Sequence, residues 1–283
     1  MLYSGNIAAV SGVYDNWSAS PSANIGTSVT CGTSSAEGLW TPIAAASDVS
    51  SNIEGFEVIV TTASNTGDRQ ILLDIGVDPA GGSSYTAIIS NIVCGNPGTF
   101  ATGMVHKYLF PMFIAAGSSI AARATNGSVT AITIIVAARF FAGNTSPETF
   151  PRGQFSETIG TITNSNGASF TPGNAVWGTW TLLGTTTLPL WWWQLAYSVS
   201  NGTITGEYTY IQLGTGGAAI KQIIGKHMHL GNTAETVGEQ LGSNLIFFNS
   251  YCPVPSGTDI YIRGRCNNAP DTGYNAVAIG IGG

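Results

Sequence analysis

The sequence has 283 residues, of which 8% are charged, 43% are hydrophobic and 10% are aromatic, and its formal net charge is −6. This composition excludes a disordered chain, because disordered chains are rich in charge and poor in aromatic residues. The acidic balance and the lack of any Lys or Arg run exclude a nucleic-acid-binding protein of the usual basic kind. The length is about twice that of a common domain and predicts two domains.

No stretch reaches the roughly 18 apolar residues that a membrane-spanning helix needs. The first residues, MLYSGNIAAVSG, lack the basic start and the continuous apolar core of a signal peptide. We therefore expect the chain to fold in a cytoplasm, without a membrane partner. A surface with so few charges also favours a symmetric homo-oligomer, because few ions lose water when it is covered.

The first predicted segment is an N-terminal arm, residues 1–25, whose Leu2 and Tyr3 are candidates for contact with a neighbouring chain. Short apolar runs with a period of two then predict strands, since helix formers rarely run together. In the first half these runs are GFEVIVTTAS, RQILLDIGV, YTAIISNIV and AITIIVAARFF. The segment 142–163 contains two prolines and is expected to link two domains.

The second half continues with further strand-like runs, which are PLWWWQLAYSVS, EYTYIQLG, AAIKQIIG, NLIFFNSY, TDIYIRGR and NAVAIGIG. Turn residues separate these runs at a spacing of roughly 8–14 residues, which is typical of a sandwich or a barrel. The fold class predicted for the whole chain is all-β and antiparallel.

The two halves repeat each other. FPMFIAAGSSIAARA and YCPVPSGTDIYIRGR share an outline, and four residues recur 140 positions later: Trp40, Gly117, Ile120 and Arg123 become Trp180, Gly257, Ile260 and Arg263. At the ends, TIIVAARFF (133–141) aligns with NAVAIGIGG (275–283). The repeat predicts an internal duplication that gives two tandem β-sandwiches of jelly-roll size, residues 26–141 and 164–283. The repeated Arg is expected to face away from the core.

Metal and thiol chemistry have few candidate residues. His227 and His229 share a strand face and are the only candidates for a metal site, but they supply just two ligands, and a polar strand face is the favoured interpretation. The cysteines form no CxxC pair. Cys252 and Cys266 admit a disulfide, although Cys266 in a reducing compartment is better explained as a small apolar residue that points inward.

Catalytic motifs are absent from the sequence. The acidic residues are scattered and no GxSxG is present, so neither a carboxylate pair nor a nucleophile elbow is marked. The glycine-rich GTGGAA (214–219) follows a predicted strand without opening a helix or carrying a Lys, which argues against a phosphate loop. We expect no enzyme, no catalytic residue and no cofactor.

The run Trp191, Trp192 and Trp193 admits two interpretations. In a regular strand Trp191 and Trp193 share one face and Trp192 takes the other. The favoured interpretation buries one face in the sandwich core and packs the other against a neighbouring domain or subunit, since Trp is enriched at interfaces. The alternative exposes the rings as a platform for a sugar.

The segments LLDIGVDPAGGSSYTAIISNIV, YLFPMFIAAGSSIAARA and TIIVAARFF resemble a recurring β-domain of tailed-phage virion proteins. That family shares an L-x-I-G-x-(D)-x-A-G-G-S strand and turn, then a Y-x-F-P-(L/M)-x-I-P-A-G-(S/T)-x-I-A-A-R hairpin. Ala115 replaces the usual Pro of the hairpin, whereas the second copy keeps Pro255. The resemblance implies a structural protein of tandem jelly rolls and brings no catalytic residue with it.

The expected function is therefore a non-enzymatic virion protein, a decoration or cement protein that binds the outside of the phage head. Its expected partners are the major capsid protein or other virion proteins and further copies of itself, as a trimer for example. The interface candidates are the tryptophan run, Arg123, Arg263 and the arm. Two alternatives stay open: a tail-fibre or receptor-binding module for host glycans, and a tail or neck structural protein.

Overall fold

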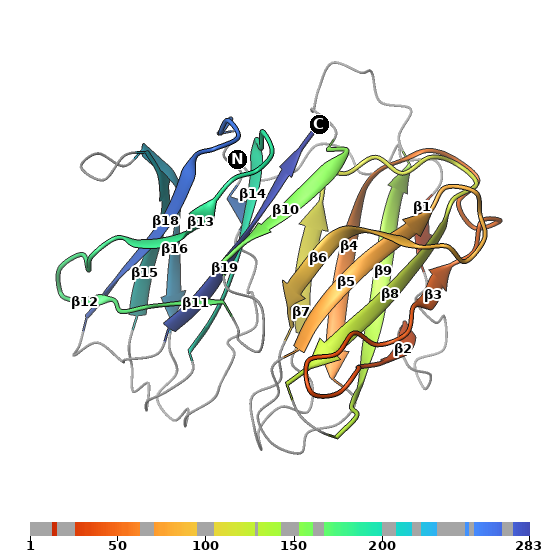
Figure 1. The fold of residues 1–283 in the computed structure, drawn as a ribbon, viewed down its shortest axis with the longest axis horizontal. Coiled ribbons are helices and arrows are strands. Elements are labelled where there is room, and N and C mark those ends of the chain that lie inside the picture. The colour runs from red at the N-terminus through yellow and green to blue at the C-terminus, as the bar shows by residue number, and fades with distance from the viewer. Residues whose placement is uncertain are drawn as a thin grey trace.

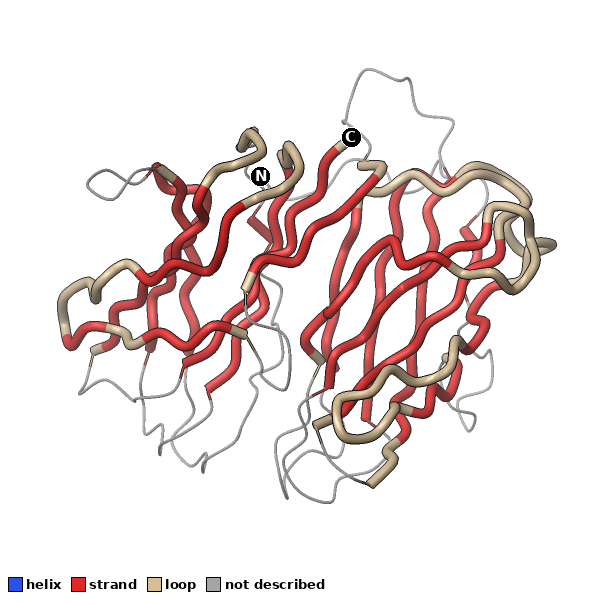
Figure 2. The backbone as a smooth tube through the Cα atoms, viewed as in Figure 1, coloured by secondary structure: helices blue, strands red, loops and turns tan. Residues whose placement is uncertain are grey.

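The structure is a computed structural model that describes part of the chain. The described residues are 13–15, 26–62, 71–94, 105–127, 130–142, 153–160, 167–199, 208–216, 222–230, 247–248, 252–267 and 274–283. Every regular element among them is a strand, as Figure 2 shows, and the strands form two sandwiches side by side (Figure 1). The predicted all-β class is confirmed, and the two sandwiches are consistent with the predicted tandem arrangement. Within the described part, no helix is long and apolar enough to cross a membrane.

The first sandwich contains β1 to β9. One sheet has the order β1-β9-β4-β7, with β2 also paired to β9, and the other has the order β3-β8-β5-β6. Successive strands mostly alternate between the two sheets, which is the arrangement of a jelly roll. The strands are β1 Val13–Asp15, β2 Thr27–Thr30, β3 Thr41–Ala44, β4 Ile53–Thr62, β5 Ile71–Asp78, β6 Thr86–Val93, β7 Val105–Phe110, β8 Ser119–Asn126 and β9 Thr133–Ala142.

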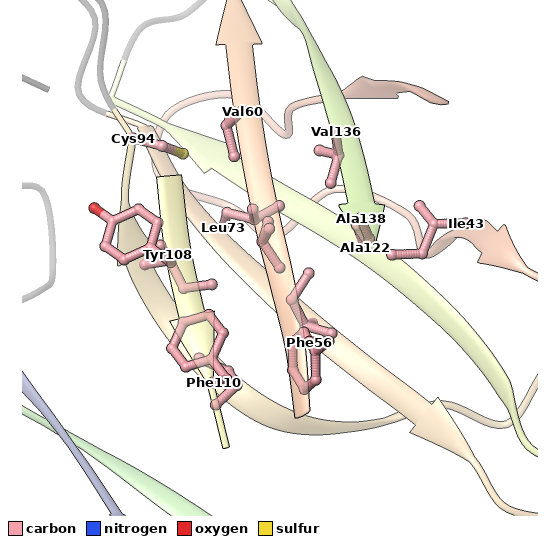
Figure 3. Close-up of a cluster of buried hydrophobic side chains, with 14 of the residues drawn as sticks. Ile43, Phe56, Val60, Leu73, Cys94, Tyr108, Phe110, Ala122, Val136 and Ala138 are labelled. Atoms are coloured by element: carbon pink, nitrogen blue, oxygen red, sulfur yellow. The ribbon is translucent and has the colours of Figure 1, made fainter. Parts of the chain in front are cut away.

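The core of this sandwich is apolar and aromatic (Figure 3). Phe56 stacks at a tilt on Phe110 and on Phe140, with ring centroids 5.3 and 5.9 Å apart. Burying each such side chain contributes roughly 1.5–3 kcal/mol. Strand β5 is buried on both faces. On its outer face the Trp40 ring lies so close to Gly76 that an added Cβ would be 2.6 Å from it, so a side chain at this position would displace the ring.

The second sandwich repeats this arrangement. Its sheets have the orders β10-β19-β14-β17, with β11 also paired to β19, and β12-β18-β15-β16, with β13 also paired to β18. The strands are β10 Phe155–Ile159, β11 Ala168–Phe170, β12 Gly173–Asn174, β13 Thr181–Thr185, β14 Trp192–Val199, β15 Tyr208–Thr215, β16 Gln222–Leu230, β17 Phe247–Phe248, β18 Asp259–Cys266 and β19 Tyr274–Gly282.

The same register occurs in both sandwiches. Thr41 pairs with Ala122 in β3 and β8, and Thr181 pairs with Ile262 in β13 and β18, with a bulge after the following pair in each case. All these positions lie 140 residues apart, which is consistent with the predicted duplication. The turn glycine before β8 and β18 also takes the same left-handed conformation, with φ of 77° at Gly117 and 75° at Gly257.

The pairing corrects the sequence alignment at the last strands. Thr27 of β2 pairs with Val136, and Ala168 of β11 pairs with Ala276. Thr27 and Ala168 each follow a glycine of positive φ, Gly26 and Gly167, so they correspond at a separation of 141 residues, and their partners in β9 and β19 correspond at a separation of 140. The alignment of 133–141 with 275–283 is therefore shifted by two residues. Two residues are one full period of a strand, and the apolar pattern alone does not distinguish the two alignments.

Two expected segments outside the sandwiches contribute strands to them. Within the expected linker 142–163, β10 pairs with β19 as an outer strand of the second sandwich. Within the expected arm 1–25, β1 pairs with β9 in the equivalent place of the first sandwich. Placing β10 in a sheet makes the connection between the sandwiches shorter than the predicted linker.

The two sandwiches meet along β10 and β6, which lie side by side in Figure 1. The Ser156 hydroxyl donates a 2.7 Å hydrogen bond to the Ile88 carbonyl, and the Thr158 hydroxyl donates to the Ser90 carbonyl. The apolar cluster of the first sandwich also continues into β14 and β19 of the second. The two domains therefore share a continuous buried interface.

Candidate interaction surfaces

The tryptophan run lies at the junction of the two domains. Trp193 is fully buried in the second core, where its indole N–H donates a 3.1 Å hydrogen bond to the Cys252 carbonyl. Trp191 and Trp192 belong to the apolar cluster that includes the first domain, and each is 8% exposed. The three rings are therefore packed inside the molecule, and the surface platform for a sugar is not formed by them.

Trp191 does not share the face of Trp193, contrary to the expectation from regular alternation. Strand β14 begins at Trp192, and Leu190 before it forms an isolated bridge with Val254. Alternation from face to face applies only inside the strand. Gln194 follows the rule, because it lies on the Trp192 face and its side-chain amide donates to the Leu109 carbonyl of the first domain.

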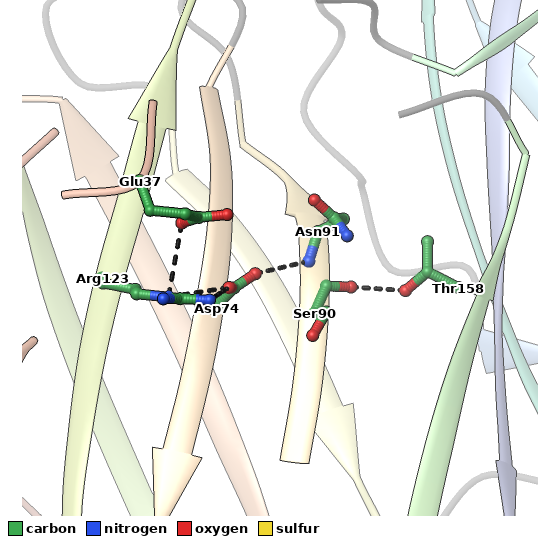
Figure 4. Close-up of polar contacts among 6 residues, drawn as sticks. All are labelled: Glu37, Asp74, Ser90, Asn91, Arg123 and Thr158. Atoms are coloured by element: carbon green, nitrogen blue, oxygen red, sulfur yellow. Dashed lines mark hydrogen bonds and ion pairs between the residues drawn. The ribbon is translucent and has the colours of Figure 1, made fainter. Parts of the chain in front are cut away.

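Arg123 lies on the outer side of β8 in the first domain and is held by acidic groups (Figure 4). Its Nε and Nη2 donate hydrogen bonds of 3.0 and 2.9 Å to Asp74 Oδ2. Glu37 Oε2 lies 3.3 Å from Nε, and the guanidinium carbon lies 4.5 Å from the centroid of the Trp40 ring. Asp74 is buried and also accepts the Asn91 backbone N–H at 2.8 Å. The Arg123 charge is thus satisfied inside its own domain.

Glu37 is the outer member of this group. Burial and the nearby Asp74 carboxylate raise the pKa of Glu37, while Arg123 lowers it. The side chain is 43% exposed. Its carboxylate therefore faces both the Arg123 guanidinium and solvent.

Arg263 occupies the equivalent place in β18 of the second domain, but its neighbours differ. The guanidinium carbon lies 4.8 Å from the Trp177 ring centroid and 4.3 Å from the Trp180 ring centroid. Its Nε donates a 2.8 Å hydrogen bond to Gln212 Oε1. Burial lowers the pKa of Arg263 from its ordinary value, because desolvation disfavours the charged form.

The Arg123 site and the Arg263 site differ in two of the residues that surround the arginine. Gln212 pairs in register with Arg263, as Asp74 pairs with Arg123. Trp177 stands 140 positions after Glu37. The second domain thus keeps the stacking of Arg on Trp and replaces both carboxylates by uncharged groups.

Sequence reasoning found Arg123 and Arg263 but missed their neighbours. Trp40 and Trp180 recur at the same separation as the two arginines, and this shared spacing was the available signal that each Trp meets its Arg. No pattern in the sequence marks Glu37, Asp74, Trp177 or Gln212, because they reach the site through a loop and through strand pairing.

The remaining candidates are placed as follows. His227 and His229 lie in β16, opposite Ile211 and Thr209, and their side chains lie outside the described part. Leu2 and Tyr3 also lie outside the described residues. Among the described residues, no group of three or more His, Cys, Asp or Glu side chains is placed to hold a metal ion.

The four cysteines are free and buried, so Cys252 and Cys266 are not joined in a disulfide. Burial raises the pKa of the Cys31 thiol to about 12, and it raises the pKa of Cys94 and Cys252 as well. A thiol that stays protonated is a poor nucleophile and a poor metal ligand.

Comparison with known proteins gives distant similarities only. No family model matches the sequence, and no curated protein is similar to it at a significant level. Among solved structures, PNGF-II has 11% identity and a TM-score of 0.36, over 90% of this chain and 64% of that chain. The STIV MCP has 10% identity and a TM-score of 0.38, over 90% of this chain and 96% of that chain. A Broad Bean Stain Virus structure has 11% identity and a TM-score of 0.28, over 81% of this chain and 75% of that chain. Similarities this distant assign neither a family nor a function.

Proposed function

We propose that this protein is a non-enzymatic structural component of a virion, and in particular a decoration protein that binds the outside of an assembled phage head. The observation that carries the proposal is the repeated hairpin. The segments that resemble tailed-phage virion proteins form β5, β6, β8 and β9 of one jelly roll, and the same register recurs in the second sandwich.

The surface chemistry supports the same role. Only 8% of the residues are charged, so an interface over much of this surface covers few ions that would need to lose their water. A protein that binds only the assembled shell stabilises that shell by mass action, without any chemical step. The buried contacts between the two sandwiches allow both to attach to the shell as one unit.

The copy number in purified particles tests the proposal. Quantitative mass spectrometry measures this protein against the major capsid protein of the same particles. A ratio near one, or near a simple fraction of one, is expected for a decoration protein. A count of a few to a few dozen copies per particle overturns the head role and favours a tail, neck or fibre protein.

The N-terminal arm is the proposed contact with the particle. Truncation of residues 1–12 leaves β1 paired with β9, so both sandwiches are expected to fold. The truncated protein is expected to lose binding to undecorated heads in a co-sedimentation assay, while its circular dichroism spectrum stays unchanged. Full occupancy of the heads by the truncated protein would exclude the arm as the contact.

A further inference from the structure

Arg263 and Arg265 form a cationic site with no acidic partner among the described residues. The other cationic side chains that the structure describes are paired: Arg123 with Asp74, and Lys107 and Arg139 with Glu57. In a chain with a net charge of −6, a pair of unpaired arginines on one strand is a local exception. Asp259 is the described acidic residue on the same face of β18, but it lies two strand periods before Arg263, about 13 Å away. Its carboxylate accepts hydrogen bonds from the Tyr261 and Thr185 hydroxyls and does not contact Arg263.

Apolar and aromatic groups surround this cationic site. Trp177 and Trp180 stack on Arg263, and Tyr210, which is 40% exposed, pairs in register with Arg265. Val176 is 65% exposed beside Trp177 in sequence. Trp, Tyr and Arg are the residues that dominate binding energy at protein interfaces. We call this set the Arg263 face.

The first domain shows what the Arg263 face lacks. There, Glu37 lies in the loop between β2 and β3, and its Oε2 is 3.3 Å from the Nε of the stacked Arg123. In the second domain the equivalent loop position is Trp177, which brings no charge. The Arg263 guanidinium therefore keeps donors for a carboxylate that the described part of its own domain does not supply.

A complementary surface exists on the same chain. The loop between β2 and β3 carries Glu37, 43% exposed, and Leu39, which at 87% is the most exposed large apolar side chain of the described residues. This loop offers a carboxylate next to an apolar group, which matches a guanidinium next to apolar rings. Figure 1 shows β12 and β18 at one end of the molecule and β2 and β3 on the other domain. The two surfaces of one molecule therefore do not meet.

We propose that the Arg263 face is a docking site for the loop around Glu37 and Leu39 of a second copy of this chain. The Glu37 carboxylate of one copy approaches Arg263 of the next, and Leu39 packs against the exposed apolar groups there. The contact joins two different surfaces, so it is head-to-tail, and it produces a ring or an open chain of copies. This docking needs no other virion protein, so the purified protein is expected to self-associate on its own.

Sedimentation velocity of the full chain tests the docking. The wild type is expected to self-associate, and Arg263→Glu and Leu39→Asp are each expected to weaken self-association at least about tenfold. Ser51→Asp is the matched control for Leu39→Asp, because it adds the same single negative charge at another exposed position, and it is expected to leave association unchanged. Leu39 is exposed, so Leu39→Asp keeps the fold even if Arg263→Glu does not, as thermal unfolding will report.

A mixing experiment distinguishes the head-to-tail contact from a symmetric one. The Arg263→Glu chain keeps an intact loop, and the Leu39→Asp chain keeps an intact Arg263 face. Their mixture is expected to form dimers of one chain of each kind and nothing larger. A wild type that stays monomeric up to about 100 μM, where micromolar interfaces are occupied, overturns the proposal, as does unchanged association of both variants. Binding of a hexuronic acid oligosaccharide by a monomeric wild type would assign the face to acidic sugars instead.

Discussion

At the scale of single residues, the same Arg has two different environments in the two domains. Arg123 neutralises Asp74, which is 3% exposed, and Arg263 contacts only uncharged groups. Removing one partner of a buried ion pair leaves the other charge desolvated and unpaired, which costs more than the pair itself contributes. The two arginines are therefore unequal in their contribution to folding stability, although they occupy equivalent positions.

Arg123→Ala is expected to lower the free energy of unfolding by about 3 kcal/mol, because among the described residues Asp74 then keeps the Asn91 backbone N–H as its one remaining partner. Arg263→Ala is expected to lower it by about 1 kcal/mol, the loss of a stacked cation. Urea unfolding followed by circular dichroism measures both. Equal losses in the two variants would contradict the assignment of Asp74 as a buried charge that depends on Arg123.

At the scale of elements, β14 connects the two domains because residues on both of its faces are buried. One face places Trp193 in the core of the second domain, and the other places Trp192 against the cluster of the first domain. A strand that is buried on both faces has no solvent side, so large apolar residues occur at consecutive positions instead of alternating with polar ones. The tryptophan run is therefore explained by packing.

Trp192→Ala is expected to destabilise the protein by about 3–5 kcal/mol, as usual for removal of a large buried side chain, and to separate the unfolding of the two domains. Trp193→Ala is expected to lower the free energy of unfolding by a similar amount, and the second domain is expected to unfold first. Differential scanning calorimetry reports the number of transitions. A single transition in Trp192→Ala would show that the domains are held together mainly by other contacts, such as those of β10 with β6.

At the scale of the whole molecule, the shared interface predicts cooperative unfolding of the two sandwiches. Each domain carries its own pair of buried free cysteines, Cys31 and Cys94 in the first and Cys252 and Cys266 in the second. These thiols report separately on the two domains. Their pKa values also bear on reactivity, since a pKa of about 12 at Cys31 leaves little thiolate at neutral pH.

Iodoacetamide at about pH 8, close to the ordinary pKa of an exposed thiol, is expected to leave all four cysteines unmodified in the native protein. Across a urea series, mass spectrometry of the alkylated peptides is expected to show modification of both pairs at the same urea concentration. Modification of Cys252 and Cys266 at clearly lower urea than Cys31 and Cys94 would show that the second domain unfolds independently. Rapid alkylation without urea would contradict the burial of the thiols.

The sequence by itself determined the all-β fold class, and it predicted two repeated domains with which the structure is consistent. Strand patterns with a period of two are local, and the recurrence of Trp40, Gly117 and Arg123 in the second half is visible without any structure. The same patterns did not place β1 and β10, because short outer strands bury too few residues to leave a periodic signal. Local patterns also did not fix how the last strands of the two halves align, because the two possible alignments differ by one full strand period.

Only the tertiary structure decided what surrounds each repeated residue. Asp74 and Gln212 reach the arginines by strand pairing, and Glu37 and Trp177 reach them from loops, so the neighbours come from distant parts of the chain. The tryptophan run likewise could be exposed or buried until the packing of the two domains against each other was known. Contacts between residues far apart in sequence depend on how the sheets pack, and this packing gives the two equivalent arginines different partners.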